Sequence, residues 1–405
     1  MKPIVRAGRM KPVHSDIRGP LFVEAMNRQK QGIDILKLNT GNPATFGFGL
    51  PDSIKNALME HMQDGVGYCD FKGMPQARQA ICDYETSKGI KGITPDDVFI
   101  GNGVSEVVSF ALTPLLNDGD EVLVPSPSYS LWGNSVYLED GKPVFYTCDE
   151  QANWYPDIQD IRSKITDKTK AIVIINPNNP TGVLYPKEIL LEIIQVAREF
   201  GLLIFADEIY DRLVMDGKQH ISLASLTEDV PVITLNGLSK SHCLCGYRCG
   251  WMVISGPREL TEDYRQGIIQ LTSLRLCANT MAQIVIPAAL DDMDTPASMV
   301  RPGGRIYEQR EATVRELEKI DGLSFVKNDA AFYVFPKLDV KKFNITNDKQ
   351  FAHDLLDATN ILLVPGSGFD WKDPDHFRIV MLPQADVLSD AIRRMGTFLD
   401  GYKQN

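Results

Sequence analysis

Long apolar runs, an excess of basic residues and a disulfide framework are all missing from this 405-residue chain. No apolar run approaches the roughly 18 residues that a membrane-spanning helix needs, and the N-terminal stretch lacks the apolar segment of a signal peptide. The chain carries 42 Lys and Arg against 53 Asp and Glu, a net charge of −11. Because nucleic-acid and anionic-membrane surfaces require clustered basic residues, we expect neither kind of partner.

The seven cysteines are odd in number and scattered from Cys69 to Cys277. This usage does not resemble a disulfide framework and predicts a reducing, cytoplasmic location. Cys243, Cys245 and Cys249 are spaced as metal ligands can be, but no second Cys or His cluster accompanies them. We therefore interpret them as ordinary core thiols and predict no metal site.

What is present is a composition close to that of ordinary globular proteins, with 43% hydrophobic and 23% charged residues. In the middle of the chain, strand-like and helix-like patterns alternate. The apolar run Ala171–Ile175 is followed by a helical stripe over Lys187–Phe200, which Gly201 ends, and then by a second apolar run, Leu202–Phe205. Strand, helix and strand at this spacing predict a mostly parallel sheet that helices cover on both faces.

The whole pattern predicts an α/β protein with two domains. Further strands of the large domain are expected at Val98–Ile100, Glu121–Val124, Pro143–Cys148, Val232–Leu235 and Trp251–Ile254. A helical stretch follows from about residue 280 to 320, which Pro296 and Pro302-Gly303-Gly304 break, and then strands at Ala331–Phe335, Ile361–Val364 and Phe377–Met381. We expect an N-terminal segment (1–50) that packs with the small domain, a large domain (51–285) and a smaller α+β domain (286–405).

Three polar residues follow predicted strands of the large domain. Asn179 lies in a turn cluster, Asp207 directly after a strand, and Lys240 shortly after another. Ligands of open parallel sheets bind beyond the carboxyl ends of the strands, so one crevice can collect all three side chains. A partly desolvated lysine is a usable amine nucleophile, and an aspartate can hold a cationic ring nitrogen. The alternatives are a solvated lysine, an N-capping aspartate and a rigid turn.

Two further features suit anions. The segment Gly101–Glu106 lies between a strand and a helix, where small residues and Ser105 can approach a phosphate at the helix N-terminus. Its alternative is an ordinary helix start. Arg378 lies in an apolar strand. Its guanidinium can bind a carboxylate in a bidentate manner or make a structural salt bridge.

Taken together and in this order, these motifs resemble the class I/II aminotransferases, the pyridoxal-phosphate enzymes of fold type I. The resemblance covers essentially the whole chain and includes Leu38–Pro43, Tyr68 with Gly73, Pro127–Tyr129, Asn179–Gly182, Asp207–Tyr210, Ser239-Lys240, Gly246–Trp251 and Phe377-Arg378. Ile17–Pro20 and Gly47-Phe48 are most similar to the bacterial glutamate–pyruvate (alanine) aminotransferases. The resemblance implies a mostly parallel seven-stranded sheet in the large domain, pyridoxal 5′-phosphate as cofactor, and a homodimer.

The resemblance also implies roles for individual residues. Lys240 would bond to the cofactor and shuttle the proton of the substrate, Asp207 would keep the pyridine nitrogen protonated, and Asn179 and Tyr210 would bond its phenolic oxygen. Tyr129 would stack on the ring. The phosphate would be held by Gly103, Val104, Ser105, Ser239 and Arg248, with Tyr68 reaching it from a partner subunit. Arg378, with Gly41 and Asn179, would bind the substrate α-carboxylate.

Two positions depart from the pattern of the family. Gly237 stands where many relatives have a hydroxyl residue for the phosphate. No arginine clearly matches the one that reads a side-chain carboxylate in aspartate aminotransferases; Arg18 is the candidate and Arg275 the runner-up.

The predicted activity is amino transfer between L-alanine/pyruvate and L-glutamate/2-oxoglutarate. The alternatives are transfer from another amino acid (aspartate, valine or an aromatic one) and a carbon–sulfur β-lyase on the same scaffold. A ligand-sensing regulator would need an appended DNA-binding module, for which the N-terminal segment is too short.

Overall fold

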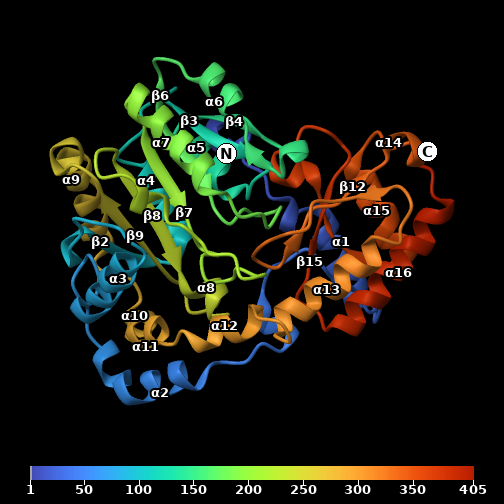
Figure 1. The fold of residues 1–405 in the computed structure, drawn as a ribbon, viewed down its shortest axis with the longest axis horizontal. Helices are drawn as coiled ribbons and strands as arrows, with labels where there is room; N and C mark the ends of the chain where they lie inside the picture. Colours follow the sequence, from blue (N-terminus) through green and yellow to red (C-terminus); the bar gives the residue numbers. More distant parts are fainter. Residues whose placement is uncertain (1) are drawn as a thin grey trace.

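The computed structural model describes residues 2–405. A large central sheet has helices on both of its faces, and the C-terminal part of the chain forms a separate group of helices and short strands beside it (Figure 1). The N-terminal segment runs between the two.

The central sheet has eight strands in the order β2-β9-β8-β7-β6-β3-β4-β5. They are β2 (Val98–Asn102), β3 (Glu121–Ser126), β4 (Lys142–Asp149), β5 (Tyr155–Pro156), β6 (Thr169–Ile175), β7 (Leu203–Asp207), β8 (Val232–Gly237) and β9 (Cys249–Ser255). β9 runs antiparallel to both of its neighbours, and the other long strands are parallel. Seven of these strands were predicted. The eighth, β5, is a two-residue edge strand paired with β4, too short to give a hydrophobic pattern.

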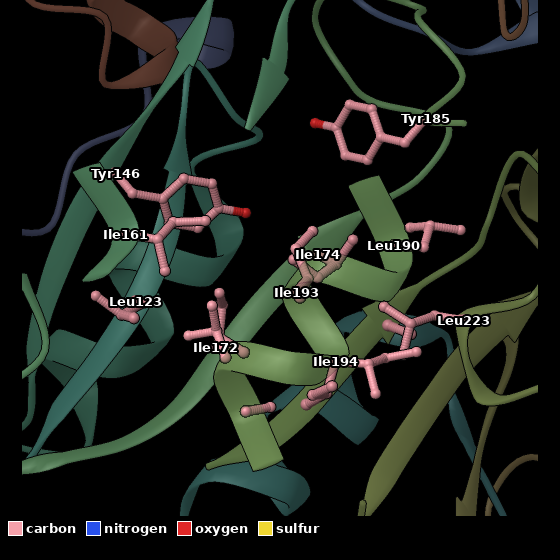
Figure 2. Packing of buried hydrophobic residues seen from close by; sticks show 14 of the residues in the cluster. Leu123, Tyr146, Ile161, Ile172, Ile174, Tyr185, Leu190, Ile193, Ile194 and Leu223 are labelled. Atoms are coloured by element: carbon pink, nitrogen blue, oxygen red, sulfur yellow. The ribbon is translucent and has the colours of Figure 1, made fainter. Parts of the chain in front are cut away.

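The inner parallel strands β3, β6, β7 and β8 are buried on both faces, as predicted, whereas β4 is only partly buried. Ile172 and Ile174 of β6 share a core with Ile193 and Ile194 of α7 (Lys187–Phe200), which Figure 2 shows in close-up. The alternate residues of β6 point to the other face and pack in a second core with residues of α4 (Val104–Leu112), α5 (Leu131–Leu138) and α9 (Arg258–Arg275). The period of two along the strand thus fixes two helical layers.

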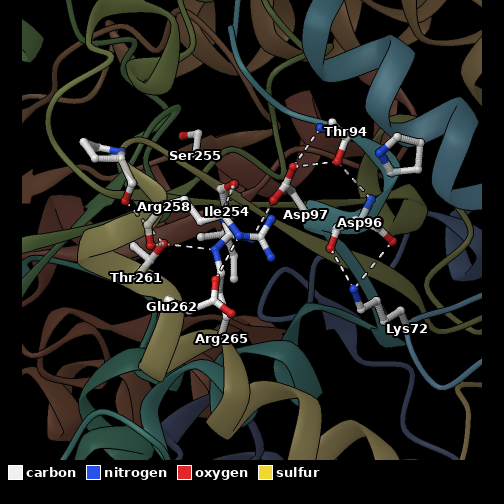
Figure 3. A network of polar contacts seen from close by, with 12 residues as sticks. Lys72, Thr94, Asp96, Asp97, Ile254, Ser255, Arg258, Thr261, Glu262 and Arg265 are labelled. Carbon is white, nitrogen blue, oxygen red and sulfur yellow. Dashed lines mark hydrogen bonds and ion pairs between the residues drawn. The ribbon is translucent and has the colours of Figure 1, made fainter.

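A buried ion pair joins α9 to the start of β2. Arg265 Nη1 donates to Asp97 Oδ1 at 2.6 Å, and Arg265 Nη2 donates to the Ile254 carbonyl oxygen at 3.0 Å (Figure 3). The other oxygen of Asp97 accepts from the backbone and the hydroxyl of Thr94. Because both charges have hydrogen-bond partners, this network is a structural anchor on the side of the sheet remote from the C-terminal part.

Four helices pack at the β2 edge of the sheet: α2 (Asp52–His61), α3 (Pro75–Ser87), α10 (Thr280–Ile284) and α11 (Ile286–Asp291). A further helix, α6 (Ile158–Lys164), packs near the opposite edge, against β4. Ile286 and Ala289 of α11 lie in one core with Ile54 of α2 and Ile81 of α3. The chain therefore still contacts the large unit just beyond residue 285, where the sequence predicted the domain boundary.

The C-terminal part packs α12 (Asp294–Val300), α13 (Arg305–Leu317), α14 (Val340–Phe343), α15 (Asp348–Thr359) and α16 (Ala385–Gly401) with short strands. These are β10 (Leu323–Ser324), β11 (Tyr333–Val334), β12 (Lys337–Leu338), β13 (Ile361–Leu362), β14 (Val364–Pro365) and β15 (Phe377–Val380). Pro296 was expected to break a helix, but it lies in the first turn of α12, where a proline is tolerated.

The N-terminal segment adds α1 (Pro20–Lys30) and β1 (Leu36–Lys37), and β1 pairs with β13 of the C-terminal part. Among the described residues no single helix is long and apolar enough to cross a membrane, although α9 taken with α10 and α11, at an angle of 119°, meets the length and composition criteria.

Candidate active site

The carboxyl edge of the central sheet gathers the residues that the strand pattern singled out. Asp207 is the last residue of β7, Asn179 follows β6, and Lys240 lies in the short helix α8 (Leu238–Ser241) after β8. β6, β7 and β8 are neighbours in the sheet, so the three side chains converge as predicted.

Lys240 is partly buried, and its Nζ donates to the carbonyl oxygen of Gly41 at 2.9 Å. No carboxylate of residues 2–405 forms an ion pair with it. Burial works to lower the pKa of Lys240, but the phenols of Tyr333 and Tyr129 and the thiol of Cys245 outweigh it and raise the pKa. The lysine is therefore surrounded by weakly acidic side chains, which is not the environment of a solvated lysine at a strand end.

Asp207 is a buried carboxylate without a cationic partner. Its Oδ2 accepts from Trp132 Nε1 at 3.1 Å, and its Oδ1 accepts from the backbone of Ile209 at 3.3 Å. Burial raises the pKa of Asp207 to about 6. Because the second hydrogen bond closes only a turn, N-capping does not account for the position of this acid. A cationic ligand group beside it would lower this pKa and stabilise the carboxylate.

Arg378 of β15 lies 1% exposed among aromatic rings. Its Nη1 donates to Asn179 Oδ1 at 2.9 Å and its Nη2 to the Asn39 carbonyl oxygen. Within the described chain, no carboxylate oxygen lies within 4.0 Å of the guanidinium. The structural salt bridge is thus wrong as an interpretation, and Arg378 is a buried cation without an anion.

A second guanidinium without an acid lies at the start of α4. Arg248 Nη1 donates to the Cys245 carbonyl oxygen at 2.9 Å, and a Cβ on Gly103 would collide with this guanidinium. Gly103 has φ +82 at the N-cap of α4, a conformation that suits glycine. Val104 and Ser105 begin the helix, and Ser239 lies partly buried beside Lys240. Amides at a helix N-terminus with an unpaired arginine bind anions such as phosphate.

Tyr210 follows β7 and is 2% exposed. Its hydroxyl and that of Tyr333 are 2.8 Å apart. Burial raises the pKa of Tyr210 well above its ordinary value.

The other predicted residues lie around this centre. Tyr129 is 37% exposed, close enough to affect the pKa of both Lys240 and Arg378. Arg18 is exposed, and the carbonyl oxygen of the preceding residue accepts from Asn39 Nδ2 at 2.9 Å. Tyr68 is 82% exposed and is not brought to the cluster by its own chain. Arg275, the runner-up, is held by Glu106 and by the carbonyl oxygens of Phe71 and Ile100.

Three residues of the centre were missed by the sequence reasoning. They are Trp132, which bonds to Asp207, Tyr333, which bonds to Tyr210, and Asn39, which accepts from Arg378. Trp132 lies inside a helix and Tyr333 in a short apolar strand, where aromatic residues usually serve the core. The motif Leu38–Pro43 did contain Asn39, but nothing in its spacing indicated that its carbonyl oxygen points to Arg378.

Known proteins are similar to this chain in sequence over its whole length. Residues 33–394 match the family described as aminotransferase class I and II. The chain is 49% identical to the glutamate-pyruvate aminotransferase AlaA of Haemophilus influenzae over 404 residues, and 47% identical to that of Escherichia coli K12, with 100% of each chain covered in both pairs.

Two solved structures have the same fold as this chain. An aminotransferase from Escherichia coli superposes with a TM-score of 0.98 at 46% identity over 100% of both chains. An alanine aminotransferase from Pyrococcus furiosus superposes at 0.93 with 40% identity, covering 98% of this chain and 100% of the other. The chain belongs to the class I and II aminotransferases.

Proposed function

We propose that this aminotransferase moves the amino group between L-alanine/pyruvate and L-glutamate/2-oxoglutarate. The observation that carries the proposal is the buried Arg378, which lacks an acid and lies near enough to Lys240 to affect its pKa. An α-carboxylate is common to all four substrates and would supply the missing anion. The names of the relatives from Haemophilus influenzae and Pyrococcus furiosus support alanine as one of the amino acids.

The unpaired groups of the site fit pyridoxal 5′-phosphate, the cofactor of this family. Asp207 fits a protonated pyridine nitrogen, since it is a buried carboxylate with no cation of its own. The N-terminus of α4 with Arg248, Ser105 and Ser239 fits the phosphate, and the Lys240 amine fits the aldehyde. Because Gly237 has no hydroxyl, the phosphate would have one hydrogen-bond donor fewer than in many relatives. In this proposal Ser239 and Arg248 compensate for the missing donor.

Each side chain then has a defined task. The bound cofactor supplies an electron sink for the electron pair left on the substrate α-carbon. Lys240 Nζ would pass the proton from that carbon to the cofactor C4′ in the first half of the cycle and from C4′ to the α-carbon of the new amino acid in the second half. Tyr210 and Asn179 would bond the phenolic oxygen, Tyr129 would cover the ring, and Arg378 would fix the carboxylate. L-alanine leaves as pyruvate after giving up its amino group, and 2-oxoglutarate takes that group and leaves as L-glutamate.

We also propose that the protein acts as a homodimer in the cytoplasm. Apolar side chains lie exposed near Tyr68, among them Met59, Met62, Val66, Leu274 and Leu276. Exposed apolar patches of this kind mark protein interfaces, and pairing of two copies there would allow Tyr68 to reach the phosphate of a partner. The seven cysteines are all free thiols, which supports a reducing compartment.

A substrate panel with two lysine variants tests the activity. The wild-type protein, loaded with cofactor, should convert L-alanine and 2-oxoglutarate to pyruvate and L-glutamate in equal amounts. Lys240→Ala should lose this turnover and still bind the cofactor noncovalently, whereas Lys91→Ala, at an exposed ion pair, should behave as wild type. Substantial multiple turnover by Lys240→Ala, or pyruvate and ammonia formed from cysteine without a 2-oxo acid, would contradict the proposal.

A further inference from the structure

Tyr333 occupies a central position that the proposed mechanism does not use. It lies in β11, paired with β15 opposite Val380, and is 2% exposed. Its hydroxyl is 2.8 Å from that of Tyr210, which follows β7 in the central sheet. A hydrogen bond between two side chains thus joins the C-terminal part of the fold to the central sheet inside the active site.

The ring of Tyr333 contacts the other half of the site. Arg378 Cζ lies 4.6 Å from the centre of this ring and 4.6 Å from that of Phe369. A guanidinium over aromatic rings is stabilised by the negative charge of their faces, and the rings limit where it can move. Tyr333 therefore helps to fix the cation that binds the substrate carboxylate.

The hydroxyl of Tyr333 also lies next to the backbone of Gly41. A Cβ at Gly41 would collide with this oxygen, so a glycine is needed at that position. The carbonyl oxygen of Gly41 accepts from Lys240 Nζ at 2.9 Å. Tyr333 consequently lies against the backbone that orients the lysine, as well as against Tyr210 and Arg378.

We propose that Tyr333 is a positioning residue that acts through Tyr210: its hydroxyl donates to the Tyr210 oxygen and thereby directs the Tyr210 proton to the phenolic oxygen of the cofactor. The proposal rests on the proposed function, because it takes that oxygen as the partner of Tyr210. A hydroxyl that accepts one hydrogen bond becomes a stronger donor in the next. Tyr333 thus strengthens the hydrogen bond that stabilises negative charge on the cofactor oxygen.

The test removes the hydroxyl oxygen of Tyr333 and leaves the rest of the side chain unchanged. Tyr333→Phe keeps the ring beside Arg378 and removes the hydroxyl. The pH at which the visible absorption of the bound cofactor changes should move upward by at least about 0.3 pH unit, because the Tyr210 donor is weaker. The KM for alanine and 2-oxoglutarate should stay within about twofold of the wild-type value, since the ring still contacts the guanidinium.

Two comparisons separate this role from a merely structural one. In a Tyr210→Phe background, Tyr333→Phe should cause no further shift of the absorption midpoint, because the residue through which it acts is gone. Tyr146→Phe is the matched control. The hydroxyl of Tyr146 is also buried but donates to the Val173 carbonyl oxygen at 2.8 Å, in the core between the sheet and α7. That variant should leave the midpoint unchanged.

The outcomes distinguish the two proposals. An unchanged midpoint in Tyr333→Phe, or an equal shift with and without Tyr210, would overturn the role of Tyr333 while leaving the transaminase intact. A wild-type protein that shows no cofactor absorption after addition of pyridoxal 5′-phosphate would instead overturn the proposed function.

Discussion

Arg378 Nη1 donates to Asn179 Oδ1 at 2.9 Å, and this bond joins a strand of the C-terminal part to the turn after β6 of the central sheet. The guanidinium is held in place by neutral acceptors, so its charge remains available. Burial lowers the pKa of Arg378 because water is absent around it, yet the group stays protonated at neutral pH. A substrate carboxylate bound beside Arg378 would therefore meet a preorganised cation.

Replacing this arginine should weaken every substrate. Arg378→Lys keeps the charge but loses the forked geometry, and hydrogen bonds to charged groups contribute about 1.5–3 kcal/mol each. We expect kcat/KM to fall by about 100-fold or more for alanine, pyruvate, glutamate and 2-oxoglutarate alike, as measured by steady-state kinetics. Arg265→Lys, at the buried ion pair of Figure 3, should lower the melting temperature without changing KM. A loss confined to one substrate in Arg378→Lys would contradict this account.

Arg18 should act on one pair of substrates. It is exposed, next to the residue that bonds Asn39, and we predict that it reads the distal carboxylate of glutamate. Arg18→Ala should raise the KM for glutamate and 2-oxoglutarate about tenfold, the value of roughly one charge-assisted hydrogen bond, and spare alanine and pyruvate. Arg9→Ala, on an exposed residue of the same segment that pairs with Asp140, is the control. Equal losses for all four substrates would exclude the role.

The contribution of Asp207 to the stability of the cofactor-free protein should fall as the pH rises from about 4 to about 6. The pKa of Asp207 is raised from 3.8 to about 6, so between these values the folded state binds more protons than the unfolded state. In urea unfolding, the wild type should lose roughly 3 kcal/mol of stability over this range relative to Asp207→Asn. Added cofactor should remove this loss, since its ring nitrogen pairs with the carboxylate. The same pH slope in wild type and Asp207→Asn would rule out this origin.

The N-terminal segment should loosen at high pH. His14 bonds to Asp370 at 3.0 Å and faces Asp16, while the backbone of His14 bonds to Asn134; the two carboxylates raise its pKa from 6.5 to about 9. Lys349, which bonds to Asp16 at 3.1 Å, is a further charged group of this cluster. The contribution of His14 to stability is therefore complete below pH 6.5 and is lost as the pH rises through 9.

Limited proteolysis can follow this loosening. Cleavage in the N-terminal segment of wild type should accelerate between pH 8 and 10, and His14→Gln should show fast cleavage already at pH 7. His61→Gln, at an exposed pair with Asp64, should match the wild type. Cleavage of wild type at one rate across this range would show that His14 does not hold the segment.

The sequence was sufficient for the parts of the fold that follow a regular period. β6, α7 and β7 carry continuous or helical apolar patterns, and the structure places them where the patterns predicted. The convergence of Asn179, Asp207 and Lys240 followed from the rule for parallel strands. The edge strand β5 was not predicted, because two residues carry no period.

The missed contacts depend on tertiary packing. Trp132 reaches Asp207 from α5, and Tyr333 reaches Tyr210 from β11, over separations of 75 and 123 residues. Both are aromatic residues in apolar surroundings, which sequence alone assigns to a core. Whether Arg378 had an acid as partner was equally a question of three-dimensional packing, and the structure answered it.

The visible spectrum of the purified protein during a half-reaction tests the central claim most directly. Addition of L-alanine alone should abolish the absorption band of the bound cofactor and release pyruvate, and 2-oxoglutarate should then restore the band and yield L-glutamate. A band that persists in L-alanine, with no pyruvate formed, would contradict the assignment of alanine as the amino donor.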